Sequence, residues 1–90
     1  MSLYFRVKRK EQTIFLSAEN TDSIQKLKND IAIINKLQDK PSDYVRLIHN
    51  GTVLDDKKTV NSLNMKNDDV VYLVYKNDDG SYEEIAASIL

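Results

Sequence analysis

One stretch of this 90-residue chain limits its fold more than any other, the run of six apolar residues from Val70 to Tyr75. Successive side chains of a strand point to opposite faces, so a strand that is apolar at every position is typically central in its sheet and covered on both sides. The run is far too short to cross a bilayer as a helix, which takes about 20 apolar residues. We therefore expect a sheet built around this strand, and no membrane partner.

The N-terminal part of the chain predicts a hairpin beside that strand. Leu3, Phe5 and Val7 alternate with residues that are polar or only partly apolar, the period-two pattern of a half-buried strand. After a polar turn around Lys10, the stretch from Thr13 to Leu16 is rich in β-branched and aromatic residues. We expect the first and last strands to be adjacent and parallel, because that arrangement explains why the last strand is apolar throughout.

The stretch after the hairpin has the pattern of one amphipathic helix. Asp22 or Ser23 can cap its first amides, and Gln25 would complete a capping box with Asp22. Apolar residues recur with helical spacing and should face the sheet, namely Ile24, Leu27, Ile31 and Ile34. The side expected to face water carries Lys26, Lys28, Asn29 and Asp30. Ile33 lies off the apolar stripe, so it is either exposed or part of a distorted last turn, and Pro41 ends the segment.

Short strands are expected between this helix and the central strand. Tyr44 to Ile48 is β-prone, and Asn50-Gly51 is the strongest turn signal because both residues tolerate positive φ. Thr52 to Leu54 then forms a short return strand. The order of elements predicts an α+β fold of the β-grasp type, with one main helix packed across a mixed sheet. We assign residues 1–76 to this domain and residues 77–90 to a C-terminal extension.

Composition excludes several functional classes. The chain has no Cys, which removes thiol catalysis, cysteine-based zinc sites and iron–sulfur ligation. Its 13 Lys+Arg against 14 Asp+Glu give a net charge of −1, whereas a nucleic-acid partner usually requires a basic excess. Two glycines cannot build a phosphate cradle. The N-terminus lacks the apolar stretch of a signal peptide, so we expect an intracellular protein.

The titratable residues show no catalytic pattern. His49 is the only imidazole and stands next to the Asn50-Gly51 turn, while the aspartate pairs of the chain fall in or before turns. We therefore expect no enzymatic activity, no cofactor, no metal and no nucleic-acid partner. The alternative is a catalytic or metal-dependent role, which would have to rest on His49 and the aspartate loops.

The same alternation that predicts the core also predicts an apolar surface on the sheet face opposite the helix. The residues that it leaves facing outwards are Tyr4, Arg6, Phe15, Ile48, Tyr72 and Val74. A contiguous apolar cluster usually marks a partner surface, although ordinary residual apolar surface on a small domain is the alternative. In the extension, Tyr82 and Ile85 are too apolar to stay solvated without cause, so we expect them to add a second contact.

From Leu3 to Lys76 the sequence resembles ubiquitin-like domains. The matching stretches are Val7-Lys8, Thr13-Ile14, Asp22 to Ile24 with Leu27-Lys28, Arg46 to Ile48, Asn50-Gly51, Leu54 to Asp56 with Thr59-Val60, and Tyr72 to Val74. Ile48 and Val74 match the isoleucine and valine of the recognition patch of ubiquitin, whereas the patch leucine has no counterpart. The chain ends at Leu90 without the diglycine that a conjugated modifier requires, so we do not expect conjugation.

Within that superfamily the chain is similar to the elongin B family. The similarity rests on the shortened basic turn Lys8 to Gln12, the outward Phe15, the stretch Leu54 to Thr59 and the tail Asp78 to Glu84. It implies a non-catalytic partner of elongin C, a Skp-like adaptor, in a pair that links box-containing substrate receptors to a cullin–RING ubiquitin ligase. In animals that pair also associates with a transcription elongation factor.

The resemblance also implies a location in nucleus and cytoplasm, and a grip on elongin C through the outward sheet face and the tail. The alternative is a ubiquitin-like module that binds ubiquitin receptors or the proteasome through Ile48 and Val74.

Overall fold

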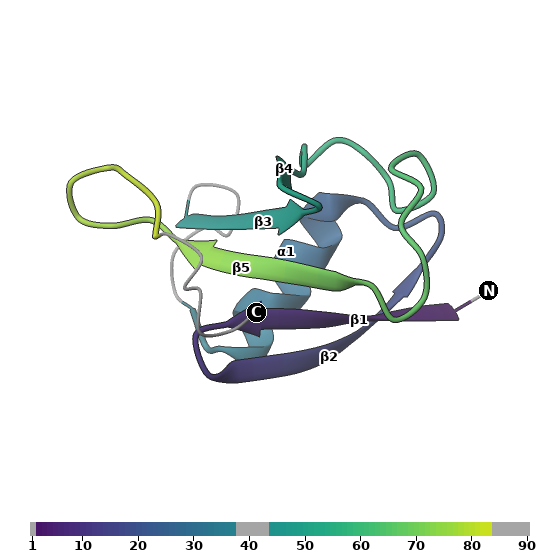
Figure 1. Cartoon of the computed structure of the whole chain (residues 1–90), viewed down its shortest axis with the longest axis horizontal. Helices are drawn as coiled ribbons and strands as arrows, with labels where there is room; N and C mark the ends of the chain where they lie inside the picture. Colours follow the sequence, from purple (N-terminus) through teal and green to yellow (C-terminus); the bar gives the residue numbers. More distant parts are fainter. Residues whose placement is uncertain (1, 38–43, 84–90) are drawn as a thin grey trace.

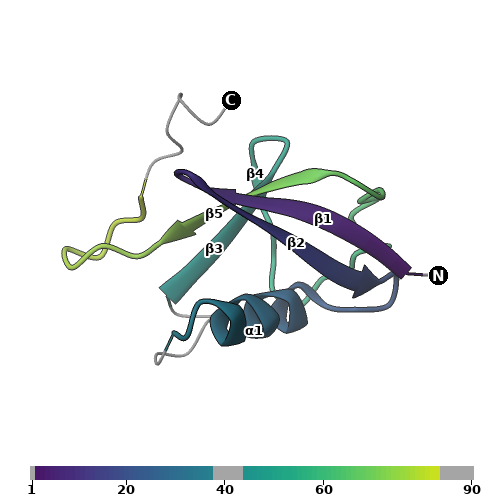
Figure 2. The same ribbon diagram turned by 90° about the horizontal axis from the view of Figure 1, so that it is seen from below.

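The computed structural model describes residues 2–37 and 44–83, which form one helix packed on one sheet. In chain order the elements are β1 (Ser2–Arg9), β2 (Gln12–Glu19), α1 (Ile24–Ile34), β3 (Val45–His49), β4 (Thr52–Val53) and β5 (Val70–Tyr75). Figure 1 shows the sheet in front of α1, and Figure 2 shows α1 lying along one face of it. The structure confirms the β-grasp prediction.

Strand β5 is the central strand, as its sequence predicts. The sheet order is β2-β1-β5-β3-β4. The first and last strands are parallel neighbours, with Arg6 opposite Val70 and Lys8 opposite Tyr72. The β1–β2, β3–β5 and β3–β4 pairs are antiparallel. The backbone therefore brings the two ends of the domain together at its centre.

The core fills the space between the sheet and α1. The fully buried side chains from the strands include Phe5, Val7, Val45, Leu47, Val71 and Leu73, and those from the helix are Ile24, Leu27 and Ile31. The connection between β4 and β5 adds Leu54, Val60 and Met65. The inward-facing residues expected from strand alternation are thus largely those that the structure buries.

The start of α1 follows one of the two predicted capping schemes. Ser23 is the N-cap, and its hydroxyl accepts a hydrogen bond from the Lys26 N–H at 3.2 Å. The alternative capping box that begins at Asp22 is wrong. The Asp22 carboxylate instead accepts from the Glu19 N–H at 2.8 Å, which stabilises the turn that leaves β2.

Lys28 does not face water as expected. It is 5% exposed and forms an ion pair with Asp56 at 2.5 Å. The connection after β4 lies against the first turn of α1, where the Ile24 and Gln25 N–H groups donate to the Lys58 and Asp56 carbonyls. That connection, which helical periodicity does not reveal, covers the Lys28 side of the helix.

The end of the helix also differs from the expected stripe. Ile34 is 49% exposed, and Ala32 is buried instead. Ile33 is 76% exposed, in line with the first of its two interpretations. The helix stops at Ile34, and Lys36 takes a left-handed conformation with φ of 56°. Pro41 lies outside the described residues.

The turn predicted at Asn50-Gly51 is confirmed. Asn50 and Gly51 have φ of 52° and 78°, the left-handed conformations that a tight turn between twisted strands requires. The return strand β4 spans only Thr52–Val53, but the Leu54 N–H still donates to the Leu47 carbonyl at 2.9 Å. No helix among the described residues has the length and apolarity needed to cross a membrane.

Leu27→Ala tests the packing of α1 on the sheet. Leu27 is 1% exposed, so its truncation should leave a cavity and lower the free energy of unfolding by about 2–5 kcal/mol. Urea denaturation measures this change. Ile33→Ala is the control on the same helix, and because Ile33 is largely exposed it should change stability by no more than about 0.5 kcal/mol. Equal losses in the two variants would contradict the observed helix orientation.

Candidate functional site

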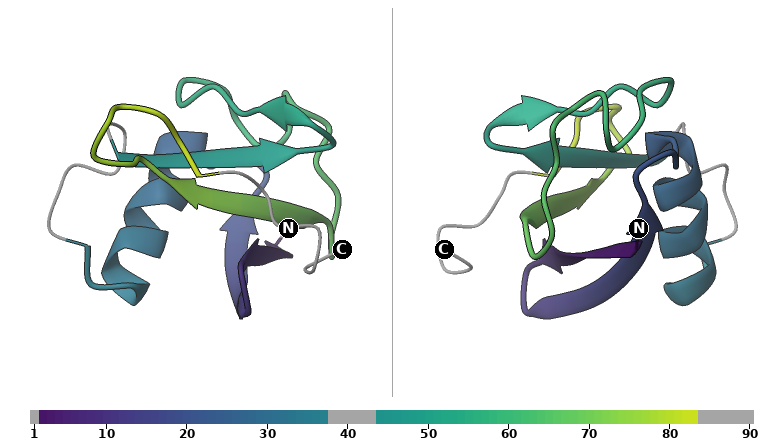
Figure 3. Two further views of the ribbon diagram at one scale, coloured as in Figure 1. Left: turned by 60° about the vertical axis from the view of Figure 1, so that its left-hand side comes forward. Right: turned by 90° about the vertical axis from the view of Figure 1, so that its right-hand side faces the viewer.

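The structure places the six outward-facing residues expected from sequence on the sheet face opposite α1. Cross-strand partners share a face, and Phe15 is opposite Arg6, Ile48 is opposite Tyr72 and Arg46 is opposite Val74. We call this the outer face; its members are Tyr4, Arg6, Lys8, Phe15, Arg46, Ile48, Tyr72 and Val74. Figure 3 shows that α1 covers only the other side of the sheet.

The most exposed apolar group of the outer face is an aromatic pair on the β1–β2 hairpin. Phe15 is 69% exposed and Tyr4 is 40% exposed, and their ring centroids are 6.4 Å apart. Arg6 lies opposite Phe15, and its Nε is 3.0 Å from a carboxylate oxygen of Asp68. An exposed aromatic pair beside an arginine has the composition of an interface hot spot.

Val74 differs from the other members of the outer face. It faces outwards, opposite Arg46, yet it is only 3% exposed. The sequence predicts a single open apolar surface that includes Val74, and this part of the prediction is wrong. Alternation gives the direction of a side chain but not what covers it.

The segment after β5 folds back on the strand that it leaves. We call residues 76–83 the C-terminal strap, the loop that extends beyond the ends of β3 and β5 in Figure 1. Lys76 and Tyr82 form an isolated antiparallel bridge, and the Glu83 N–H donates to the Tyr75 carbonyl at 2.9 Å. The reversal is closed by Asp79, whose carboxylate accepts from the Ser81 N–H at 2.9 Å.

An ion pair fixes the end of the strap to β1. Arg9 donates from Nε and Nη2 to the two carboxylate oxygens of Glu83 at 2.9 and 2.6 Å. The same carboxylate accepts from the Tyr75 N–H at 2.9 Å and lies 3.5 Å from Lys10 Nζ. Partial burial alone would raise the pKa of Glu83, but the hydrogen bonds from Arg9 and Tyr75 and the positive charges of Arg9 and Lys10 outweigh it and lower that pKa.

Tyr82 lies against the outer face within the same chain. The Arg46 guanidinium stands 3.8 Å from the centre of the Tyr82 ring, a cation–π contact. The sequence predicts a partner contact for Tyr82 and Ile85. That contact stays a prediction for Tyr82, whose ring has an intramolecular neighbour, and Ile85 lies outside the described residues.

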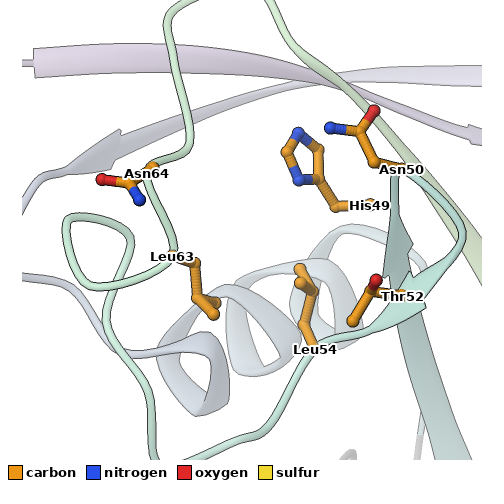
Figure 4. A pocket seen from close by; sticks show the side chains of 6 residues that line it. All are labelled: His49, Asn50, Thr52, Leu54, Leu63 and Asn64. Carbon is orange, nitrogen blue, oxygen red and sulfur yellow. The ribbon is translucent and has the colours of Figure 1, made fainter.

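His49 has a partner that its position beside a turn does not predict. Its Nε2 lies 3.0 Å from a carboxylate oxygen of Asp69, which also accepts from the Lys66 N–H at 2.8 Å. Figure 4 shows the His49 ring at the border of a cavity of about 300 Å³, with Leu54 and Leu63 at its apolar end. The described residues contain no group of three or more His, Cys, Asp or Glu side chains that could hold a metal ion.

A shallow groove runs between β2 and α1, beside the exposed edge of the sheet. Its volume is about 350 Å³, and it is lined by Phe15, Leu16, Ser17, Asp30, Ile33 and Ile34. Gln12 at the start of β2 and Asn35 after α1 are joined by two side-chain hydrogen bonds of 3.0 and 3.3 Å. Sequence reasoning missed this groove because it expected Ile34 to be buried.

Glu83→Gln tests the ion pair that holds the strap. We expect it to lower the free energy of unfolding by about 1–2 kcal/mol at neutral pH, because hydrogen bonds to charged groups are worth about 1.5–3 kcal/mol and these atoms are partly exposed. The pKa of Glu83 is lowered in the folded state, so this stability is fully present above the ordinary value of 4.5 and is lost as the pH falls through the folded-state value.

Urea denaturation of wild type and Glu83→Gln over an acid pH series measures the effect, and the two proteins should converge in acid. Glu11→Gln is the matched control, because Glu11 is exposed in the β1–β2 turn. A constant difference between wild type and Glu83→Gln at every pH would contradict the role of the ionised carboxylate.

Comparisons with known proteins agree with this architecture. The model of the ubiquitin family matches residues 3–78. The solution NMR structure of a ubiquitin-like domain from an Arabidopsis thaliana protein superposes with a TM-score of 0.75 at 18% identity, covering 87% of this chain and 81% of that one. A search of curated proteins found no match. Since the family model spans most of the sequence, the chain belongs to the ubiquitin family.

Proposed function

We propose that this ubiquitin-family chain is a non-catalytic subunit of the elongin B type, which pairs with an elongin C-like adaptor. The observation that carries the proposal is the open aromatic pair Tyr4–Phe15 on the outer face, with Phe15 69% exposed. Exposed aromatic side chains grouped beside an arginine have the residue composition of a partner surface. The complex of this chain with the elongin C-like adaptor would link box-containing substrate receptors to a cullin–RING ubiquitin ligase, in nucleus and cytoplasm. It would also associate with a transcription elongation factor.

The features behind the resemblance to elongin B have physical consequences that support the proposal. The shortened turn leaves only Lys10 and Glu11 between β1 and β2. A turn of this length is too short to cover the outer face. Lys10 takes positive φ of 53° to make this tight reversal. Phe15 then stands clear on the second strand of the hairpin, and the tail begins with the strap that reaches the opposite end of the same face.

The alternative is a ubiquitin-like module that binds ubiquitin receptors or the proteasome through Ile48 and Val74. Of these two residues, Ile48 is partly exposed, whereas Val74 is 3% exposed. An interface built on Ile48 and Val74 would therefore find only Ile48 accessible in this structure, whereas Phe15 and Tyr4 are both exposed.

Phe15→Ala tests the proposal with purified elongin C as the probe. An aromatic anchor at an interface centre contributes about 2 kcal/mol or more, so we expect affinity to fall by more than tenfold. Urea denaturation should show little change in stability, because the Phe15 side chain is largely exposed. Isothermal titration calorimetry measures the affinity, and Ile33→Ala, an exposed apolar change on α1, serves as the control.

Two outcomes separate the proposal from its alternative. If the wild-type chain does not bind elongin C but binds a proteasomal ubiquitin receptor, the interaction-module alternative replaces the adaptor proposal. If elongin C binds wild type and Phe15→Asp equally, and both proteins fold, the interface does not lie on the outer face.

A further inference from the structure

The end of β5 carries a built site that the chain itself occupies. The last residue of β1 that pairs with β5 is Lys8, opposite Tyr72, so the β1 side of Tyr75 is left to another segment. Glu83 takes this place, because its N–H donates to the Tyr75 carbonyl and its carboxylate accepts from the Tyr75 N–H, both at 2.9 Å. Residue 83 thus uses both main-chain groups that Tyr75 presents on this side.

The carboxylate-binding part of this site is held in place by groups outside the strap. The Arg9 guanidinium lies 4.0 Å from the centre of the Tyr75 ring, and the Tyr75 hydroxyl accepts from Asn35 Nδ2 at 2.7 Å. Tyr75 also packs against Tyr44, with ring centroids 5.4 Å apart. A guanidinium stacked on an anchored ring is oriented before its ligand arrives, which lowers the entropy that binding costs.

A second part of the site holds an aromatic ring. Arg46 on β3 lies over the Tyr82 ring at 3.8 Å, beside its buried cross-strand partner Val74. Arg9 and Lys10 supply the positive charge at the Glu83 carboxylate, whereas Arg46 supplies the cation that contacts the ring. The two parts of the site are therefore complementary to a carboxylate and to an aromatic ring.

We propose that Arg9, Lys10, Arg46 and Tyr75 form a binding site for an extended peptide segment in which an aromatic residue is followed by a carboxylate. Tyr82-Glu83 is its tethered occupant, and a segment of the same chemistry on a partner protein binds there by displacing the strap. Tethering gives the cis occupant an effective concentration in the millimolar range, so the partner segment must compete with it. The proposal does not rest on pairing with elongin C, because it is argued only from contacts that the strap makes within the chain.

The experiment vacates the two side-chain positions of the site and offers the occupant back in trans. The receptor is the full chain with Tyr82→Ala and Glu83→Gln, and the probe is a synthetic peptide of residues 77–83 with acetylated and amidated ends. Amide NMR shifts should change at Arg9, Tyr75 and Arg46 on titration. The same peptide with glutamine in place of its glutamate should bind about tenfold more weakly, because it loses a charge-assisted bidentate contact.

Wild type should bind the peptide more weakly than the vacated chain, since its own strap occupies the site. Absence of shifts in the vacated chain, equal binding of the two peptides, or equal binding by wild type and variant would each overturn the proposal. Neither Tyr82 nor Glu83 belongs to the buried core, so the double variant should fold. If its spectrum is that of an unfolded chain, Glu83→Gln alone provides the same comparison.

Discussion

The parallel pairing of β1 with β5 is the contact on which the rest of the structure depends. It places strands from the two ends of the domain side by side at the centre of the sheet. Parallel neighbours cannot be joined by a tight turn, so the chain between them has to travel across a face of the sheet and back. Helix α1 makes that crossing, and its buried Leu27 and Ile31 belong to the same core cluster as the inward residues Val71 and Leu73.

Much of this architecture could be predicted from sequence because it depends on local periods. Alternation in β1 and in Val70–Tyr75 identifies the inward residues, and the spacing of Ile24, Leu27 and Ile31 identifies the buried stripe of α1. The left-handed turn at Asn50-Gly51 follows from residue type alone. Each of these patterns lies within a short stretch of sequence, and the tertiary contacts of the folded chain favour the same local structure.

What sequence reasoning missed comes from segments that meet only in the folded chain. Lys28 has the residue type of a solvated helix face, but the connection after β4 supplies Asp56 and closes over it. His49 is the last residue of β3 and Asp69 immediately precedes β5, and the two side chains meet only in the folded chain. Val74 points outwards as alternation requires and is nevertheless buried. A periodic pattern carries no information about which distant segment will cover a given face.

The Lys28–Asp56 pair shows what such a long-range contact costs and contributes. Removing a lysine ammonium from water is expensive, and the attraction to one carboxylate offsets that penalty only with good geometry. The pair is therefore weak as a source of net stability. The main effect of the pair is to position the connection after β4. The Asp56 carbonyl also accepts a hydrogen bond from the Gln25 N–H, so Asp56 holds this connection against the first turn of α1. Removing Asp56 would leave the Lys28 charge buried, whereas Asp56 itself is partly exposed.

The two ends of the outer face differ in how they meet a partner. At one end Tyr4 and Phe15 are exposed, so binding there does not require another part of the chain to be displaced. At the other end the Tyr82 ring of the strap stacks on Arg46, and a partner must replace this contact that the chain makes with itself. A partner that binds the aromatic pair can therefore leave the strap in place, whereas one that covers the whole outer face has to displace Tyr82. Arg9 holds Glu83 from the other side of the sheet, because in β1 it shares a face with the inward Phe5 and Val7, so complete release of the strap also requires a group that replaces the Glu83 carboxylate.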